Sequence, residues 1–220
     1  MSGGRLSPLQ MRVLRILAAV RPQGVVTGGA ALVGFYLQHR TTRDLDLFWH
    51  GRQHLGDVSR MVEDLLVGES LTVEPVQTSS SFRRLRVSDA AETVILDLVA
   101  DPTETIEPPR VVDFDGARLV VDAPHEILVN KLCALLGSME LRDLQDVRGL
   151  LSANGDLARA VADAPRKDAG FSALTLAWIL KGMRVRTLAE AVGISASDAE
   201  ALAMFQSDLV DRLLSIGAPE

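Results

Sequence analysis

Hydrophobic and polar positions alternate in short runs through the first half of the chain, which is the pattern of half-buried strands. The runs predict strands at residues 24–27, 44–48, 71–75, 82–87, 93–99 and 118–121. Apolar positions at helical spacing predict helices over residues 30–38 and 57–67, and the proline-containing run 101–109 is expected to be a loop. Ser7 before Pro8 predicts the N-cap and first residue of another helix.

The hydrophobic spacing changes to a helical period at Asp122 and keeps it to the end of the chain. Short breaks between the later helices are predicted at Gly137, 154–155, 165–170 and Gly193. We therefore predict two domains, an α/β domain over residues 1–121 and a helical domain over residues 122–220. A mixed or antiparallel sheet with inserted helices belongs to the α+β class.

Composition and charge narrow the class of protein. The 220 residues carry a net charge of −6, which argues against non-specific coating of nucleic acid, because such binding depends on Lys and Arg neutralising phosphates. No run reaches the roughly 18 apolar residues of a membrane-spanning helix, so no membrane contact is expected. Cys133 is the only cysteine, which excludes an internal disulfide and favours a cytoplasmic location.

Two aspartates lie on one face of the predicted strand 44–48. Residues two apart in a strand share a face, so Asp44 and Asp46 point the same way, while Leu45 and Leu47 point into the core. Adjacent carboxylates repel each other unless a cation lies between them, and a hard divalent ion such as Mg²⁺ prefers oxygen ligands. The pair therefore predicts a metal site. The alternative is two solvated acids on an exposed strand face.

A third carboxylate lies in the middle of an apolar run. Asp97 sits within residues 93–99, where burial of a carboxylate is costly unless it is paired or binds a metal. Asp97 is thus the candidate third metal ligand and a candidate acceptor for the proton of a reacting hydroxyl. Asp101 is a weaker candidate at the end of the same run. An edge-strand acid that faces water is the structural alternative for Asp97.

Two glycines separate a predicted strand from a helix. At Gly28 and Gly29 the backbone can turn tightly and approach a ligand, and the N–H groups at the start of the next helix face an anion. A Gly-Gly pair alone is usually a turn. Followed by a helix and then by the acidic strand, it predicts a phosphate site beside a cation site, as nucleotidyl transfer requires. Arg40 is expected either to hold phosphate or to balance the charge of Asp44.

These residues resemble a known family. The segments Gly28–Leu32 and His39–Phe48 are similar to the nucleotidyltransferase signature of the AbiEii/AbiGii-type toxin family, which belongs to the DNA polymerase β-like superfamily. A second block, Glu126–Leu136 followed by Arg142–Val147, resembles the helical lysine and the Arg-Asp-x-x-Asp motif of that family. The resemblance implies a polymerase β-like nucleotidyltransferase sheet with flanking helices in residues 1–121, followed by a helical C-terminal half.

The resemblance also implies functional residues in both predicted domains. The implied catalytic residues are Asp44, Asp46, Asp97, Lys131 and Asp143. The implied ligands of the metal ions, Mg²⁺ or Mn²⁺, are Asp44, Asp46 and Asp97. The implied nucleotide-binding residues are Gly28, Gly29, Arg40 and Lys131. In this scheme Lys131 contacts the triphosphate, and Asp143 completes the site from the helical domain.

The implied reaction moves a nucleoside monophosphate from a nucleoside triphosphate (NTP) to an acceptor hydroxyl, often of RNA and in particular of transfer RNA. Such enzymes are commonly toxins that an antitoxin protein neutralises. Two departures stand out: Ala30 replaces a usual Ser or Thr, and Ser138 replaces a usual Arg. Two alternatives remain open. The acidic net charge favours a small-molecule, antibiotic-type nucleotidyltransferase, and the two departures favour a non-catalytic nucleotide-binding or partner-docking module.

Several of these residues have structural interpretations as well. Lys131 lies at the edge of an apolar stripe from which it can reach water, and Asp143 and Asp146 can form a charge cluster on a helix surface. Trp49 and Trp178 are expected in the core rather than as platforms for base stacking. A solvated strand face, with RNA contact as the alternative, is expected for Arg83, Arg84 and Arg86.

Overall fold

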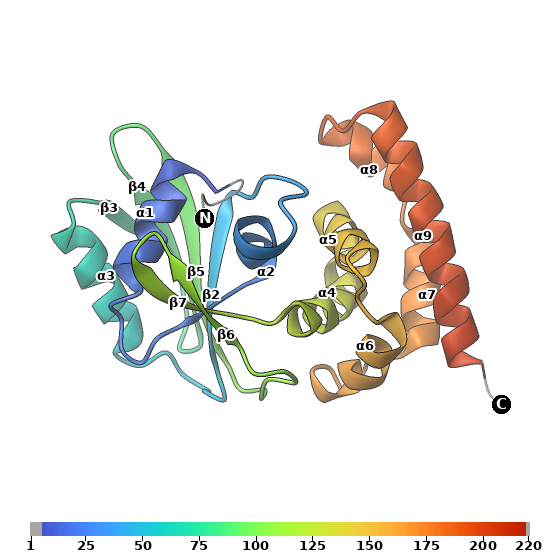
Figure 1. The fold of residues 1–220 in the computed structure, drawn as a ribbon, viewed down its shortest axis with the longest axis horizontal. Coiled ribbons are helices and arrows are strands. Elements are labelled where there is room, and N and C mark those ends of the chain that lie inside the picture. Colours follow the sequence, from blue (N-terminus) through green and yellow to red (C-terminus); the bar gives the residue numbers. More distant parts are fainter. Residues whose placement is uncertain (1–5, 219–220) are drawn as a thin grey trace. The chain divides into compact units, whose positions relative to one another are not determined.

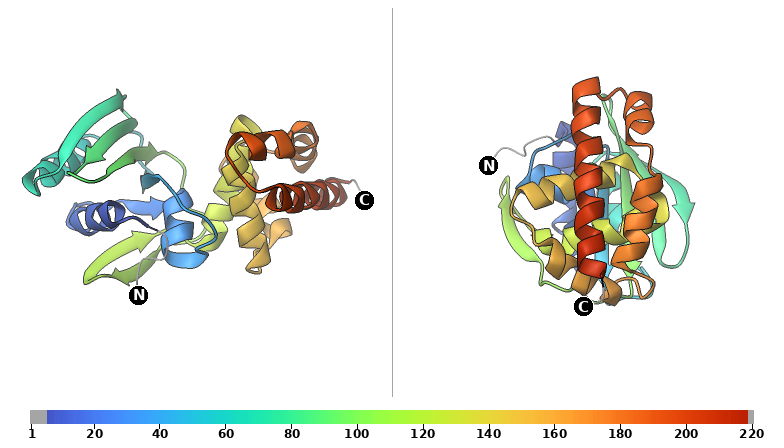
Figure 2. Two further views of the ribbon diagram at one scale, coloured as in Figure 1. Left: turned by 90° about the horizontal axis from the view of Figure 1, so that it is seen from above. Right: turned by 90° about the vertical axis from the view of Figure 1, so that its right-hand side faces the viewer.

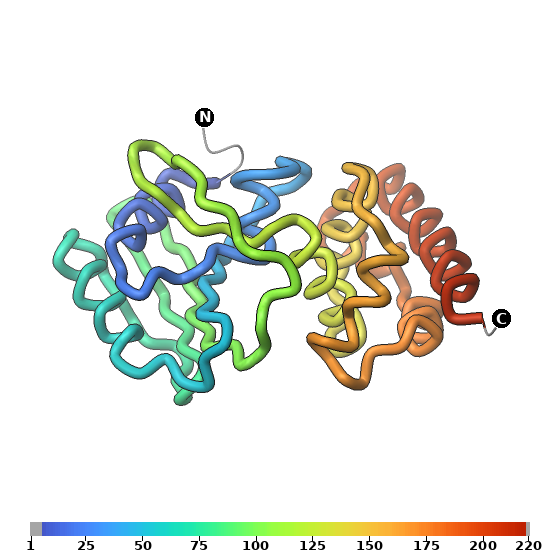
Figure 3. Tube along the Cα trace, turned by 60° about the horizontal axis from the view of Figure 1, so that its bottom comes forward, coloured from blue at the N-terminus to red at the C-terminus, as the bar shows by residue number. Residues whose placement is uncertain are grey.

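The computed structural model describes residues 6–218, and the chain divides into two compact units between Pro124 and His125. This division lies close to Asp122, where the helical period of the sequence begins. The outermost residues of both predicted domains, 1–5 and 219–220, lie outside the described part of the chain. Figure 3 traces the first unit from blue to green and the second from yellow-green to red.

The first unit is built on one mixed sheet of seven strands (Figure 1). In spatial order the strands are β3 (Thr72–Thr78), β4 (Phe82–Ser88), β5 (Thr93–Asp101), β2 (Asp44–His50), β1 (Val25–Thr27), β7 (Ala117–Val121) and β6 (Arg110–Phe114). The β2–β5 and β1–β7 pairs are parallel, and the other pairs are antiparallel. The predicted strands are all present. Strand β6 was not predicted, because most of its positions are exposed and show no alternation.

Strand β2 separates apolar from polar side chains. Leu45, Leu47 and Trp49 are buried, while Asp44 and Asp46 on the other face are partly exposed. The period of two in the sequence therefore predicts correctly which side chains enter the core. Trp49, 4% exposed, also confirms its expected core position.

The helices of the first unit begin close to where the sequence predicts. Helix α1 (Pro8–Leu17) is capped by Ser7 in a reciprocal capping box with Gln10, and it packs against α3 (Val58–Gly68). The helix after the glycine pair differs from the prediction. It begins at Gly28, and its first turn, α2 (Gly28–Ala31), continues into a π-helical segment, η1 (Leu32–Tyr36). A wide π turn does not follow the 3.6-residue period used to predict helices.

The second unit consists of helices joined by short connections, as far as residues 125–218 are concerned. Its elements are α4 (Pro124–Ser138), α5 (Leu141–Ser152), α6 (Leu157–Asp163), the short 3₁₀ turn η2 (Ala164–Arg166), α7 (Ala173–Gly182), α8 (Val185–Ala191) and α9 (Ala196–Gly217). The long helix α9 runs beside α7 and also packs against α8 (Figure 2). No helix in residues 6–218 is long and apolar enough to cross a membrane.

Trp178 lies on the outer face of α7, and 75% of its surface is exposed. The expectation of a core position is therefore wrong. Leu176, Ala177 and Leu180 form the buried face of the same helix. Residues 173–180 are almost entirely apolar, so the sequence does not mark which side of this helix faces inward.

Candidate functional site

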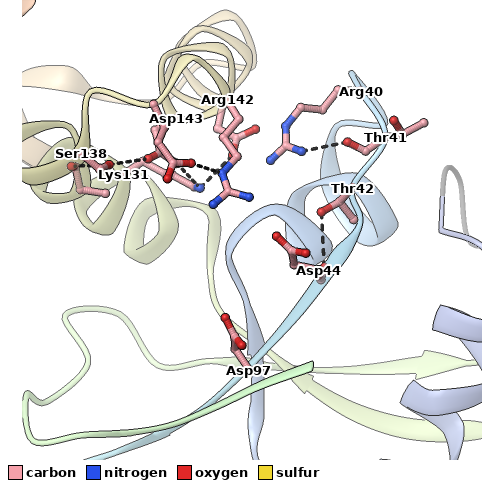
Figure 4. Close-up of polar contacts among 12 residues, drawn as sticks. Arg40, Thr41, Thr42, Asp44, Asp97, Lys131, Ser138, Arg142 and Asp143 are labelled. Carbon is pink, nitrogen blue, oxygen red and sulfur yellow. Dashed lines mark hydrogen bonds and ion pairs between the residues drawn. The ribbon is translucent and has the colours of Figure 1, made fainter. Parts of the chain in front are cut away.

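Three aspartates come together on two neighbouring parallel strands of the first unit. Strands β2 and β5 pair in register, so that Asp46 lies beside Asp97. Residues that pair in register point to the same face of a sheet, and Asp44 shares the face of Asp46. Figure 4 shows Asp44 and Asp97 in this arrangement. The structure thus brings together the three carboxylates singled out in the sequence, and Asp97 is the most buried of them.

Arg84 binds the carboxylate of Asp97 from the neighbouring strand. The two residues pair across β4 and β5, and the Nε and Nη2 groups of Arg84 donate hydrogen bonds to the two oxygens of Asp97 at 2.8 and 2.7 Å. These hydrogen bonds raise the pKa of Arg84 above its ordinary value, and the charges of Asp44 and Asp46 add to the effect. The buried carboxylate is therefore already paired with a cation of the chain itself.

The neighbouring arginines of β4 are paired as well. Arg83 donates to Glu63 at 2.9 Å, and Arg86 donates to Glu74 at 3.0 Å. The three arginines are thus ion-paired. The side chains of Arg84 and Arg86 keep 41% and 50% of their surface exposed, and Arg83, on the other face of the strand, is mostly covered. Local sequence does not reveal these partners, because they depend on the register between strands and on the packing of α3.

The glycine pair brings the backbone at the start of α2 against the acidic strand. Gly28 has a φ of 61°, and a Cβ atom there would lie 2.6 Å from Oδ2 of Asp46. A Cβ on Gly29 would lie 2.6 Å from Nη2 of Arg40. Gly28 is therefore favoured by its conformation and by the nearby Asp46 carboxylate, whereas a side chain at position 29 would displace the end of the flexible Arg40 side chain. Ala30, which follows them, is fully buried.

Arg40 is held beside this turn by the loop that precedes β2. Its Nη1 group donates to the carbonyl oxygen of Thr41 at 2.9 Å, and the Thr42 hydroxyl donates to the carbonyl oxygen of Asp44 at 3.3 Å (Figure 4). The guanidinium lies against the backbone of Gly29, in the space that a side chain at that position would occupy. A phosphate at the start of α2 would therefore find both backbone N–H groups and a cation.

The chemistry of the donor set suits a hard divalent cation. Asp44, Asp46 and Asp97 offer only carboxylate oxygens, which Mg²⁺ and Mn²⁺ prefer. Within residues 6–218 no three His, Cys, Asp or Glu side chains already converge as a metal cage, and both oxygens of Asp97 are engaged by Arg84. Asp44 and Asp46 have the chemistry of a cation site, and Asp97 would have to bind a cation through the lone pairs that Arg84 leaves free.

In the helical unit, Lys131 of α4 binds two aspartates of α5. Its Nζ lies 2.6 Å from Oδ1 of Asp143 and 3.0 Å from Oδ2 of Asp146. Burial acts to lower the pKa of Lys131, but the charges of Asp146 and Asp143 outweigh it and raise the pKa above its ordinary value. The Ser138 hydroxyl donates to the carbonyl oxygen of Ala134 at 3.1 Å and lies 3.5 Å from Oδ2 of Asp143 (Figure 4).

The alternative of a surface charge cluster is wrong for Asp143 and Asp146, because both are buried. Lys131 does not extend to water either, since these two carboxylates hold its ammonium group. A buried lysine fixed between two acids is pre-oriented and remains charged. Its contact with a triphosphate, and the catalytic role of Asp143, stay predictions.

A second polar cluster, at the C-terminal end of β2, was missed in the sequence. His50 lies 3.0 Å from Oδ2 of Asp101 through Nδ1 and 3.2 Å from Oδ1 of Asp122 through Nε2. Burial acts to lower the pKa of His50, but the hydrogen bonds and charges of Asp101 and Asp122 raise it to about 9. The charged imidazole thus joins β2, β5 and the segment after β7. No local motif links three residues so far apart in the chain.

Carboxylates on the central strands of a mixed sheet, beside a glycine turn into a helix, have the chemistry that nucleotidyl transfer requires: acids for a cation and backbone N–H groups for phosphates. Solved structures agree on the fold. A nucleotidyltransferase candidate from H. pylori aligns with a TM-score of 0.54 and 20% identity over 97% of this chain and 100% of its own. JHP933 from Helicobacter pylori aligns with a TM-score of 0.51 and 21% identity over 93% of this chain and 90% of its own.

The family model of the nucleotidyltransferase AbiEii toxins, of the type IV toxin–antitoxin system, matches residues 12–213. The chain belongs to this family. The resemblance drawn from the sequence and the predicted α+β nucleotidyltransferase fold are therefore confirmed. The antibiotic-resistance factor ANT(2'')-Ia aligns over 86% of this chain and 98% of its own with a TM-score of 0.47 and 14% identity, too weak a likeness to argue from. Among curated proteins, no match was found.

Proposed function

We propose that this nucleotidyltransferase moves a nucleoside monophosphate from an NTP to a hydroxyl of RNA, with transfer RNA as the first candidate, and that it requires Mg²⁺ or Mn²⁺. The observation that carries the metal-dependent reaction is the in-register placement of Asp46 and Asp97, with Asp44 on the same face, beside the Gly28 turn. The RNA acceptor rests on the family resemblance. So do a toxin role in the cytoplasm and an antitoxin protein as partner.

Each part of the first-unit site has a role in this proposal. Backbone N–H groups at Gly28 and Gly29, together with Arg40, bind the phosphates. Asp44 and Asp46 would hold the cation, with Asp97 as the third carboxylate beside them. A bound divalent cation neutralises charge on the reacting phosphate and on the leaving pyrophosphate.

The transfer is a single displacement at the α-phosphorus. The acceptor oxygen forms a bond to the α-phosphorus, the bond from the α-phosphorus to the bridging oxygen of the β-phosphate breaks, and pyrophosphate leaves. The proton of the acceptor hydroxyl passes to Asp97. We assign triphosphate binding to Lys131, and Asp143 orients Lys131 through its 2.6 Å contact.

The test is label transfer from each α-³²P-labelled NTP to total transfer RNA, with Mg²⁺ or Mn²⁺. Wild type is expected to label RNA, and the Asp44→Asn/Asp46→Asn variant to lose transfer by about 100-fold, because it removes two carboxylates that would bind the cation. The matched control is Asp57→Asn/Asp113→Asn, which removes two exposed acids outside the site and is expected to keep wild-type transfer.

Other outcomes decide between the alternatives. Wild-type transfer rates in the Asp44→Asn/Asp46→Asn variant would refute the metal-ligand assignment. If a small molecule accepted the nucleotide and RNA remained unlabelled, the antibiotic-type reaction would be favoured over transfer to RNA. NTP binding without any turnover would favour the non-catalytic module. Growth arrest on expression, relieved by a gene adjacent to this one, would support the toxin and antitoxin roles.

A further inference from the structure

The exposed indole of Trp178 is the starting point for an inference about the helical unit. Trp178 is 75% exposed, while the chain's other tryptophan, Trp49, is 4% exposed. A tryptophan usually buries most of its surface, and a large apolar group left in water commonly marks a binding site. The described fold gives Trp178 no core to enter, since its helix buries Leu176 and Leu180 on the opposite side.

Trp178 lines a cavity between the end of α4 and the end of α7. The cavity has a volume of about 510 Å³ and is lined also by Leu136, Gly137, Met139, Ile179, Lys181 and Gly182. Sites for small molecules fall in the range of roughly 300–1,000 Å³. The cavity is therefore large enough for a small planar group with its substituents.

Charge and chemistry indicate the occupant. Among the described residues, Lys181 is the only ionisable one that lines the cavity, although the whole chain has a net charge of −6. A base can stack on an exposed indole, a thioether such as that of Met139 packs well against aromatic rings, and a lysine beside them pairs with phosphate. An apolar, aromatic cavity with one cation at its rim is complementary to a nucleotide unit.

We propose that this cavity binds an unpaired nucleobase of single-stranded RNA, with Trp178 as the stacking platform and Lys181 as the contact to the adjoining phosphate. The inference rests on the proposed function in one respect, since the RNA bound there is the acceptor. It does not depend on transfer chemistry. The cavity holds the acceptor strand through one base, independently of the NTP.

The test uses the fluorescence of Trp178 in the full-length chain, with Trp49→Phe to remove the second indole and Asp44→Asn/Asp46→Asn to prevent transfer. Adding a short single-stranded RNA, without NTP, is expected to quench the emission. Trp178→Ala is expected to weaken RNA binding about 5- to 100-fold, which is the range for the loss of one stacked base. The affinity is measured by the fluorescence anisotropy of labelled RNA. Trp178→Phe should retain most of the binding. Lys181→Ala should make RNA affinity less dependent on salt concentration, by about the amount that one phosphate contact contributes.

Matched controls are Met204→Ala and Arg212→Ala, which remove an exposed apolar side chain and an exposed cation outside the cavity. If Trp49→Phe does not fold, the difference spectrum between wild type and Trp178→Phe reports the same indole. RNA binding without quenching, equal loss in Met204→Ala and Trp178→Ala, or equal quenching by duplex RNA would each overturn the proposal. Quenching by RNA in a chain whose wild type labels no acceptor would uphold this inference while the proposed reaction fails.

Discussion

The guanidinium of Arg84 takes both oxygens of Asp97, the same atoms that a third metal ligand would have to offer. A carboxylate that is only 7% exposed cannot remain without a partner at low cost. If Asp97 is a third metal ligand, as we propose, the positive charge of Arg84 would oppose the binding of a cation there. The pair neutralises the buried carboxylate when no metal is bound.

Arg84→Gln is expected to bind Mn²⁺ more tightly than wild type, by about 5-fold, which is about 1 kcal/mol for removal of one competing cation. Titration followed by electron paramagnetic resonance measures free Mn²⁺ directly. Without metal, the same variant should unfold more readily, by about 1–3 kcal/mol, because Asp97 loses its partner. Added Mn²⁺ should restore part of that loss.

Arg86→Gln is the matched control, since it removes an exposed arginine from the same strand and from an exposed pair with Glu74. Its Mn²⁺ affinity should equal that of wild type. Equal Mn²⁺ affinities in Arg84→Gln and wild type would show that Asp97 takes no part in metal binding.

At the scale of single residues, the sequence predicts the direction of a side chain where that direction follows from local periodicity. The shared face of Asp44 and Asp46 follows from a spacing of two, and the structure shows it. The Arg84 partner of Asp97 does not follow, because it depends on how two strands are paired. The exposure of Trp178 does not follow either, because an apolar helix has no polar stripe to mark its outer face.

At the scale of elements, the junction of β1 and α2 places the backbone of Gly28 against the carboxylate of Asp46. Gly28→Ala is expected to lower the free energy of unfolding by about 1–3 kcal/mol, because its φ of 61° disfavours a Cβ and that Cβ would lie 2.6 Å from Asp46. Transfer activity should fall strongly as well, since either Asp46 or the start of α2 must move. Urea unfolding and the label-transfer assay measure the two effects.

Gly51→Ala is a control that separates the effect of a positive φ from the effect of a close contact. Gly51 has a φ of 71°, but no atom lies within 4 Å of its Cβ position. This variant should lose about 1 kcal/mol of stability for its conformation alone and keep transfer. If both variants lost activity to the same extent, the fit between Gly28 and Asp46 would not be the cause.

The elements themselves were largely predictable, and their exceptions have physical causes. The capping box of α1 and the alternating strands β2 and β5 were visible in the sequence. The edge strand β6 carries few buried residues, so its sequence shows no alternation. The π-helical segment η1 departs from the helical period by its wider turn, with a hydrogen bond from Leu37 N–H to Leu32 at 2.7 Å.

At the scale of the whole molecule, His50 ties three parts of the first unit together. Its pKa of about 9 exceeds the ordinary 6.5, so the folded state binds a proton that the unfolded chain releases between these two values. This contribution to stability is complete below pH 6.5 and is lost as the pH rises through 9. The free energy of unfolding is expected to fall over that range by up to about 3 kcal/mol.

His50→Gln keeps a polar side chain of similar reach but removes the titrating group. Urea unfolding of wild type and variant at pH 6.5 and pH 9 should show a steep loss for wild type and a shallow one for His50→Gln. Asp101 and Asp122 are the charged groups that face the imidazole. An equal slope in both proteins would place the pH dependence elsewhere in the chain.

The change of period from two to 3.6 near Asp122 predicts two domains, and the described chain divides into two compact units between Pro124 and His125. The order of the strands was not. Neighbours such as β1 and β7 are joined by pairing between Val26 and Val121, and no local pattern reports contacts over that distance. The nucleotidyltransferase sheet was predicted from the family resemblance and not from the periodicity of the sequence.

The same β1–β7 pair has a consequence for synthesis. Strand β1 is made early but is flanked in the sheet by a strand made last in its unit. A nascent chain therefore carries the glycine turn and the acidic strand long before the sheet can close around them, and the enzyme gains its activity only after this unit is complete. A chain cut in the loop between β5 and β6 separates β1 from its neighbour β7. We expect neither piece alone to transfer a nucleotide, and label transfer after mixing the two pieces would test whether the sheet can close from separate chains.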